Sequence, residues 1–180
     1  MDFAFAAIGL ALLAPLLLLV ALAIVLESGA PVLFRQQRIG AQGRPFEIWK
    51  FRSMVPDAAS RGPYHTDAGD PRVTRVGRFI RRTSLDELPQ LLNVLRGEMS
   101  LVGPRPDVPA QQALYAPADW ALRCSVRPGI TGLAQALLRS EATPRQRLEL
   151  DLRYVREHDL WLDLRILAWT VRRLGGRGAN

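Results

Sequence analysis

The stretch from Thr83 to Pro106, TSLDELPQLLNVLRGEMSLVGPRP, is the most informative part of this 180-residue chain. It contains two adjacent carboxylates, Asp86 and Glu87, and it ends in the rigid turn Gly103-Pro104-Arg105-Pro106. The segment before it is rich in arginine, with Arg72, Arg75, Arg78, Arg81 and Arg82. Carboxylates held among fixed guanidinium groups indicate a site for a phosphorylated substrate, where an acid attacks phosphorus or holds a metal ion.

The local structure around the acid pair allows two interpretations. Ser84 and Glu87 match a capping box, which predicts a helix that ends at the natural stop Gly97. Pro89 falls one turn into that helix, so a start nearer Asp86 is the alternative. If their role is only structural, the two acids are a solvated helix cap. If their role is functional, they share a site, although adjacent positions lie about 100° apart around a helix.

The N-terminal segment predicts a membrane helix. Every residue from Phe3 to Leu26 is apolar or glycine, and Gly29 and Pro31 predict the end of the helix. At about 1.5 Å per residue the run reaches roughly 36 Å, against a hydrocarbon core of about 30 Å. A signal peptide fits poorly, because Asp2 stands where basic residues are expected and the run exceeds the usual length of about 7–15 residues. A buried helix of a soluble protein is a further alternative.

Pro15, near the middle of this run, predicts a kink, because proline removes a backbone hydrogen bond and clashes with the preceding turn. A kinked helix can return to the membrane face from which it entered. A spanning helix would place Met1 outside and the arginine-rich remainder in the cytoplasm. Both models put the rest of the chain on the cytoplasmic side, and the apolar run alone does not separate them.

The remaining sequence predicts an α/β fold that is mostly helical, with a small β-hairpin. Val32–Arg38 and Pro45–Phe51 are rich in β-branched and aromatic residues and flank Gly40–Gly43, which predicts the hairpin. Residues 53–72 predict a mobile loop, with an active-site lid as one interpretation. We further expect a helix at Ala110–Ser125, a tight loop at Arg127–Gly132 and two amphipathic helices from Arg145.

The last of these helices also allows two interpretations. Its apolar residues recur at helical spacing beside two tryptophans: Leu160, Leu164, Leu167, Val171 and Leu174, with Trp161 and Trp169. This pattern fits core packing, and it fits equally a position at the lipid headgroups, which tryptophan and arginine favour.

Composition narrows the class of protein. The net charge of +7, from 24 basic and 17 acidic residues, favours phosphates, nucleic acid or anionic lipid as partners. The single cysteine, Cys124, excludes an intrachain disulfide and predicts a reduced, buried thiol in a cytosolic compartment. His65 and His158 are isolated in the sequence, which argues against a histidine-based metal site or catalytic triad.

Four segments, taken in order, resemble one known family. They are PVLFRQQRIGAQGRPFEIWKFRSM, DPRVTRVGRFIRRTSLDELPQLLNVLRGEMSLVGPRP, RPGITGLAQ and LDLRYV, and they cover nearly the whole chain from residue 31 onward. The chain is similar in these segments to the bacterial sugar transferases, also called small monotopic phosphoglycosyl transferases. The resemblance implies a kinked re-entrant membrane helix at residues 1–30 and a compact cytoplasmic catalytic domain at residues 31–180, with interfacial amphipathic helices.

Members of this family move a sugar 1-phosphate from a UDP-sugar to undecaprenyl phosphate and release UMP, which starts the assembly of an exopolysaccharide, O-antigen or glycoprotein glycan. The resemblance therefore implies a transferase at the inner, cytoplasmic membrane, with its catalytic domain on the cytoplasmic face. The implied partners are a UDP-sugar, undecaprenyl phosphate and anionic lipid headgroups, and no nucleic acid. The sugar, the glycan pathway and the oligomeric state stay open.

The resemblance also implies roles for the two acids. Asp86 corresponds to the nucleophile that forms a covalent phosphosugar–enzyme, and Glu87 to a metal or proton partner in the same site. A carboxylate near a helix N-terminus and beside arginines is expected to stay ionised, which suits a nucleophile. The implied cofactor is Mg²⁺, with Asp86 as its ligand, because a hard divalent ion offsets diphosphate charge and accepts carboxylate oxygen.

Basic residues supply the expected phosphate contacts. Arg81 and Arg105 are the first candidates, since the locked φ angles of the flanking prolines restrict Arg105. The candidates of second rank are Lys50, Arg52, Arg75 and Arg127. Asp151 matches a family acid near the site, with Asp163 as its rival.

Two features depart from the family pattern, and two other functions compete. Ala14-Pro15 replaces the usual Ser-Pro near the middle of the helix, and Met1-Asp2 replaces the usual basic residues before it.

A membrane-anchored module that binds nucleic acid or anionic lipid is the first competing function. It would explain the basic pI but not the acid pair, and Phe79 is the only aromatic residue between residues 70 and 106 available for base stacking. A structural adaptor with a decayed catalytic motif is the second rival, although the motif lacks none of its acids or arginines.

Overall fold

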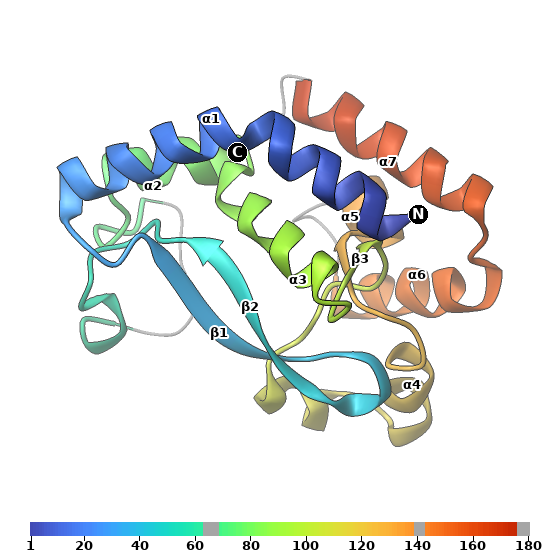
Figure 1. Ribbon diagram of the computed structural model, residues 1–180. Helices are drawn as coiled ribbons and strands as arrows, with labels where there is room; N and C mark the ends of the chain where they lie inside the picture. The colour runs from blue at the N-terminus through green and yellow to red at the C-terminus, as the bar shows by residue number, and fades with distance from the viewer. Residues whose placement is uncertain (63–68, 139–142, 176–180) are drawn as a thin grey trace.

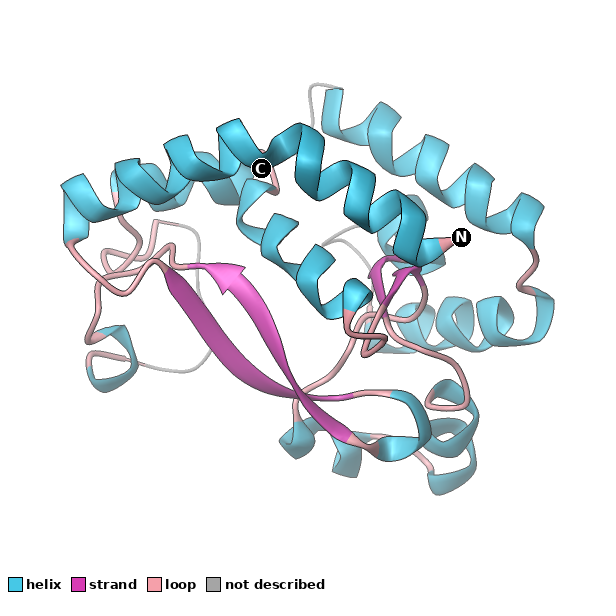
Figure 2. Ribbon diagram, viewed as in Figure 1, coloured by secondary structure: helices cyan, strands magenta, loops and turns pink. Residues whose placement is uncertain are grey.

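The computed structural model describes residues 1–62, 69–138 and 143–175, which form a mostly helical molecule with two small sheets (Figures 1 and 2). The expected lid at residues 53–72 lies partly outside the described residues. Its described part contains a short 3₁₀ turn at Ala58–Ser60 and a bridge between Met54 and Val73. Helices and strands follow the order α1, β1, β2, α2, α3, β3, α4, β4, α5, α6 and α7.

Helix α1 (Asp2–Ser28) is one helical element that includes Pro15. Its C-terminal cap is Gly29, where the sequence predicts the end of the helix. Of the described residues, only this helix is long and apolar enough to cross a membrane. Figure 1 shows it running above α3 and the small sheet of β3. Ala6, Val20 and Ile24 are buried against the rest of the chain. Most of its large apolar side chains remain exposed, among them Phe3, Leu12, Leu18 and Leu26.

The predicted hairpin is confirmed within one residue. Strands β1 (Leu33–Ile39) and β2 (Pro45–Phe51) pair antiparallel, from Leu33 opposite Phe51 to Ile39 opposite Pro45. The turn between them uses left-handed backbone at Gln42 and Gly43, with φ of 57° and 72°. This hairpin fixes the position of Lys50 and Arg52 near the end of β2.

The tight loop expected at Arg127–Gly132 is wrong, because part of it is a strand. β4 (Gly129–Thr131) pairs in parallel with β3 (Ser100–Val102). The two chains approach so closely that a Cβ atom on Gly129 would lie 2.1 Å from the backbone nitrogen of Gly103. A side chain at either glycine would therefore separate β4 from β3, the strand that leads into the proline-rich turn Gly103–Pro106.

The acid pair lies in a 3₁₀ helix, Leu85–Gln90, between α2 (Arg75–Arg82) and α3 (Leu91–Leu95). The predicted capping box is wrong. Ser84 adopts a left-handed φ of 57° and its side chain makes no cap hydrogen bond. Glu87 reaches two cations instead, and these charge-assisted bonds are stronger than a local bond to a backbone amide.

The single helix expected at Ala110–Ser125 is also wrong. The segment contains a 3₁₀ turn at Pro109–Leu114 and the short helix α4 (Pro117–Arg123). Ala116 separates them with an extended ψ of 140°, because the residue before a proline is pushed out of the helical region.

The two predicted C-terminal helices are present as α6 (Pro144–Glu157) and α7 (Leu160–Gly175), and α5 (Leu133–Leu138) packs against both. The buried residues of α7 include Leu162 and Ile166, whereas Leu160, Trp161, Leu164 and Val171 are exposed. Leu167 and Trp169 pack against the core, so the residues of the predicted stripe divide between the core and the outer face of α7. Cys124 is buried, as expected for a structural thiol.

Candidate active site

Glu87 is held by two cations from different parts of the chain. Its Oε1 atom lies 2.7 Å from Lys50 Nζ on β2 and 2.5 Å from Arg105 Nη2 in the proline-rich turn. Arg105 Nη1 also donates to Oε2 at 3.3 Å, so this guanidinium engages both oxygens. Burial alone would raise the pKa of Glu87, but the charges of Arg105 and Lys50 outweigh burial and hold it below its usual range. Glu87 is therefore a fixed anion.

Asp86 is in a different state from its neighbour. Within the described part of the chain no side chain forms an ion pair or hydrogen bond with its carboxylate. Burial, followed by the negative charge of Glu87, raises the pKa of Asp86 to about 6, against the opposing charges of Lys50, Arg81 and Arg105. The sequence predicts that neighbouring arginines keep Asp86 ionised. The cations do lower its pKa, but they offset only part of the effect of burial and of the Glu87 charge, so the pKa stays above its usual value. With a pKa of about 6, the carboxylate is still mostly ionised near neutral pH.

Arg81 extends from the last turn of α2 toward the acid pair. Its Nε atom donates to Ser53 Oγ at 2.7 Å, and its charge lowers the pKa of Asp86. Asp70, which forms an ion pair with Arg72 at 2.6 Å, lies close enough for Arg81 to lower its pKa as well. Arg81, Lys50 and Arg105 thus surround the acid pair with cations from a helix, a strand and a turn.

The second-rank cations, Lys50 apart, lie elsewhere. Arg52 is buried, and its Nη2 atom donates to the carbonyl oxygens of Ser28 and Gly29 at the end of α1. Arg75 is exposed at the start of α2, and its backbone amide donates to Glu27. Arg127 is exposed, with its backbone against Gly103. None of these three belongs to the cations that act on Asp86.

Asp151 faces the interior instead of the acid pair. It is buried on α6 and pairs with Arg123 Nε at 2.9 Å. Its rival Asp163, on α7, accepts a hydrogen bond from Tyr154 at 2.8 Å. Each acid therefore has a partner among the helices.

Sequence reasoning missed several contributors to the site. Ser53 orients Arg81, and Arg123 contacts the backbone of Arg105. Glu27 accepts hydrogen bonds from the amides of Arg75 and Val76 and thus caps α2. Ser53 could have been predicted, because it directly follows the segment that contains Lys50 and Arg52. Arg123, a single arginine in a short helix, and Glu27, a single acid after an apolar run, have no sequence pattern that indicates a role in the site.

The residues present fit a magnesium ion held partly by substrate. Among the described residues no group of three or more histidine, cysteine or acidic side chains could enclose a metal. Both oxygens of Glu87 are engaged by cations, which leaves Asp86 as the available carboxylate. One carboxylate with substrate phosphates and water is a usual arrangement for Mg²⁺.

Known proteins match this chain over almost its whole length. An undecaprenyl-phosphate glucose phosphotransferase of Komagataeibacter xylinus is 52% identical over 172 positions, which cover 89% of this chain and 32% of that protein. A UDP-glucose:undecaprenyl-phosphate glucose-1-phosphate transferase of Caulobacter vibrioides is 50% identical, with coverage of 95% and 67%. A UDP-N-acetylgalactosamine-undecaprenyl-phosphate N-acetylgalactosaminephosphotransferase of Aeromonas hydrophila is 43% identical, with coverage of 100% and 44%.

The chain thus spans between about a third and two thirds of the length of these relatives. The family model for bacterial sugar transferases matches residues 1–177, a range that includes α1, the acid pair, the proline-rich turn and α7. The chain belongs to the bacterial sugar transferase family.

Proposed function

We propose that this chain transfers a sugar 1-phosphate from a UDP-sugar to undecaprenyl phosphate through a covalent intermediate on Asp86. The observation that supports this most directly is the difference between the two acids. Glu87 is fixed by Lys50 and Arg105, whereas the neighbouring Asp86 has no ion-pair partner among the described residues and keeps a raised pKa. The names of the relatives support the same donor and acceptor classes.

In the first step an Asp86 carboxylate oxygen attacks the phosphorus that bears the sugar. The bond from that phosphorus to the oxygen shared with UMP breaks, and UMP leaves with the electron pair. Arg81 and Arg105 would bind the phosphate oxygens, whose charge grows in the transition state. Asp86, together with the diphosphate, would hold a magnesium ion, which would neutralise further charge on the leaving group.

In the second step a phosphate oxygen of the lipid attacks the same phosphorus. The bond to Asp86 breaks, which regenerates the carboxylate and forms a lipid diphosphate sugar. The covalent intermediate lets a soluble donor and a membrane acceptor react in turn, so they need not occupy the site together. The fixed charge of Glu87 maintains the positions of Lys50 and Arg105 between the two steps.

The location of α1 supports a reaction at the cytoplasmic face of the inner membrane. Its last turn is joined to both sides of the site: Ser28 accepts from Arg52 on the segment after β2, and Glu27 caps α2, which carries Arg81. We propose that α1 re-enters the membrane, because residues near both of its ends pack on the catalytic part. The exposed apolar faces of α1 and α7 would then lie among the lipids, with exposed arginines of α2 at anionic headgroups.

The test is a reaction of the purified protein with undecaprenyl phosphate, Mg²⁺ and single UDP-sugars. UDP-glucose, UDP-galactose and UDP-N-acetylgalactosamine are the first donors, because these sugars occur in the names of the relatives. Release of UMP and formation of a lipid-linked sugar are expected with at least one donor. EDTA should stop release, and Mg²⁺ should restore it. Donor breakdown that does not depend on the lipid acceptor and leaves no protein adduct would contradict the proposal.

A further inference from the structure

The proline-rich turn is held through every carbonyl from Pro104 to Asp107. The outer two accept from backbone amides: Pro104 from Gly129 at 3.0 Å and Asp107 from Ile39 at 2.9 Å. The inner two accept from guanidinium groups: Arg105 from Arg123 and, at the longer distance of 3.5 Å, from Arg147, and Pro106 from Arg38. These donors come from β1, α4, β4 and α6, so elements far apart in the sequence fix one turn.

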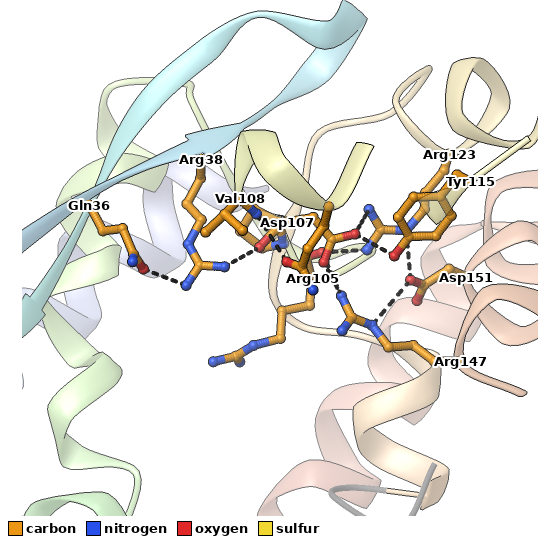
Figure 3. Close-up of polar contacts among 11 residues, drawn as sticks. Gln36, Arg38, Arg105, Asp107, Val108, Tyr115, Arg123, Arg147 and Asp151 are labelled. Atoms are coloured by element: carbon orange, nitrogen blue, oxygen red, sulfur yellow. Dashed lines mark hydrogen bonds and ion pairs between the residues drawn. The ribbon is translucent and has the colours of Figure 1, made fainter. Parts of the chain in front are cut away.

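Arg123 is itself immobilised in a buried cluster of charges (Figure 3). Only 4% of Arg123 is exposed, and its guanidinium contacts Asp107 and Asp151, each at 2.9 Å. Arg147 also binds Asp107, so two arginines balance two acids, and Tyr115 donates to Asp107 at 2.6 Å. With its other nitrogens engaged by acids, the Nη2 atom of Arg123 is directed at the Arg105 carbonyl.

Arg105 links this cluster to the acid pair. Figure 3 shows its backbone among the clustered side chains and its own side chain leading away from them. At the far end its guanidinium engages both oxygens of Glu87. The two ends of one residue are thus held by Arg123 and by Glu87, on either side of a backbone that the flanking prolines restrict.

We propose that Arg123 is a positioning residue for the transfer reaction: it holds the Arg105 carbonyl and thereby keeps the Arg105 guanidinium where the donor phosphate binds. This inference rests on the function proposed above. A guanidinium fixed before the substrate arrives loses less conformational freedom when it binds phosphate. If the cluster only stabilised the fold, a change at Arg123 would reduce activity by the same factor whether or not Arg105 is present.

A double-mutant cycle separates these two roles. Arg123→Lys keeps a positive charge for the two acids but replaces the planar fork with a single ammonium group, which cannot hold the acids and the carbonyl together. We expect it to lower kcat/KM for the UDP-sugar by about 10- to 100-fold, mainly through KM. In an Arg105→Ala background the same change should cost less than about twofold, because the group that it positions is gone.

Tyr115→Phe is the matched control, because it removes a hydrogen bond from the same cluster without touching Arg105. Its effect should be small and equal in both backgrounds. If Arg123→Lys unfolds, the pair Arg123→Met with Asp151→Leu removes one charge of each sign and is the better tolerated substitution. Where turnover falls below detection, equilibrium dialysis of radiolabelled UDP-sugar supplies the same cycle as Kd.

Equal losses from Arg123→Lys with and without Arg105 would overturn the inference and leave a structural cluster. That outcome differs from failure of the proposed function, in which the unsubstituted protein would show no lipid-dependent UMP release with any donor. Because wild-type turnover is measured in the same series, the two failures are distinguishable.

Discussion

At the scale of single residues, the site separates two carboxylates that are adjacent in the chain. Lys50 and Arg105 donate hydrogen bonds to both carboxylate oxygens of Glu87 and keep it ionised. Asp86 receives only the longer-range field of those cations, which offsets part of its burial. Glu87 thus organises the site, and Asp86 is available for chemistry.

The first prediction concerns the nucleophile. Asp86→Asn should abolish the covalent adduct that intact mass detects after incubation with UDP-sugar alone, and turnover should fall on the order of 10⁴-fold, since an amide oxygen is a poor nucleophile. Asp119→Asn, a half-exposed position on α4, should form the adduct normally. An adduct of the correct mass that persists in Asp86→Asn would assign the nucleophile to another residue.

The second prediction concerns pH. The pKa of Asp86 is about 6, so protonation below that value removes the attacking form. The rate of adduct formation should fall about tenfold for each pH unit below 6 and level off above it. Four charged groups face Asp86: Glu87 from its own 3₁₀ helix, Lys50 from β2, Arg81 from α2 and Arg105 from the turn.

A variant checks the origin of that midpoint. Lys50→Gln removes a charge that lowers the pKa of Asp86, so the midpoint should move to higher pH. The measurement is a set of single-turnover rates between about pH 5 and 8. A profile that is flat over this range, or a midpoint that moves down in Lys50→Gln, would contradict the assignment.

At the scale of elements, the close contact between β3 and β4 determines where the proline-rich turn begins. A Cβ atom on Gly129 would meet backbone atoms at 2.1–2.6 Å, and backbone cannot move aside as a flexible side chain can. Gly9 on α1 is the opposite case, because a Cβ there would lie 3.6 Å from Leu91, an ordinary contact.

The third prediction follows from this contrast. Gly129→Ala should destabilise the protein by about 1–3 kcal/mol, as overpacking usually does, and should weaken UDP-sugar binding by displacing Arg105. Gly9→Ala should leave both quantities nearly unchanged. Thermal unfolding in detergent and equilibrium binding provide the two readouts. A fully stable Gly129→Ala protein with normal binding would show that the strands can separate without consequence for the turn.

The same elements show what sequence reasoning could predict. The hairpin, α1 and the C-terminal helices have long periodic or apolar signals; the sequence predicts the bounds of the hairpin and α1 closely, and it predicts two C-terminal helices from Arg145 without the boundary between them. Strands β3 and β4 are three residues each, too short for any periodicity. The capping box failed because tertiary charges drew Glu87 away from its local partner. The acid pair, Arg81 and Arg105 come from one short segment, whereas Arg123 reaches the turn only through the fold.

At the scale of the whole molecule, α1 is both a candidate membrane helix and part of the core. Near its start, Ala6 and Leu10 pack with Leu91 and Met99. Near its end, Val20 and Ile24 pack with Phe51 and Ile80, while the outward face stays apolar. A helix that crossed about 30 Å of hydrocarbon would carry its first turns away from Leu91 and Met99, so these contacts support the proposed re-entry.

The last prediction is therefore that both ends of α1 stay on the cytoplasmic side. Asp2→Cys in a Cys124→Ser background should resist an impermeant thiol reagent in intact cells and react after lysis. Asp57→Cys, at an exposed position of the catalytic part, supplies the cytoplasmic reference in the same background. Labelling of position 2 but not of position 57 in intact cells would show that α1 spans the bilayer. If re-entry depends on Pro15, then Pro15→Leu should strengthen the backbone of α1 at its centre and favour a straight, spanning helix, which would make position 2 reactive from outside.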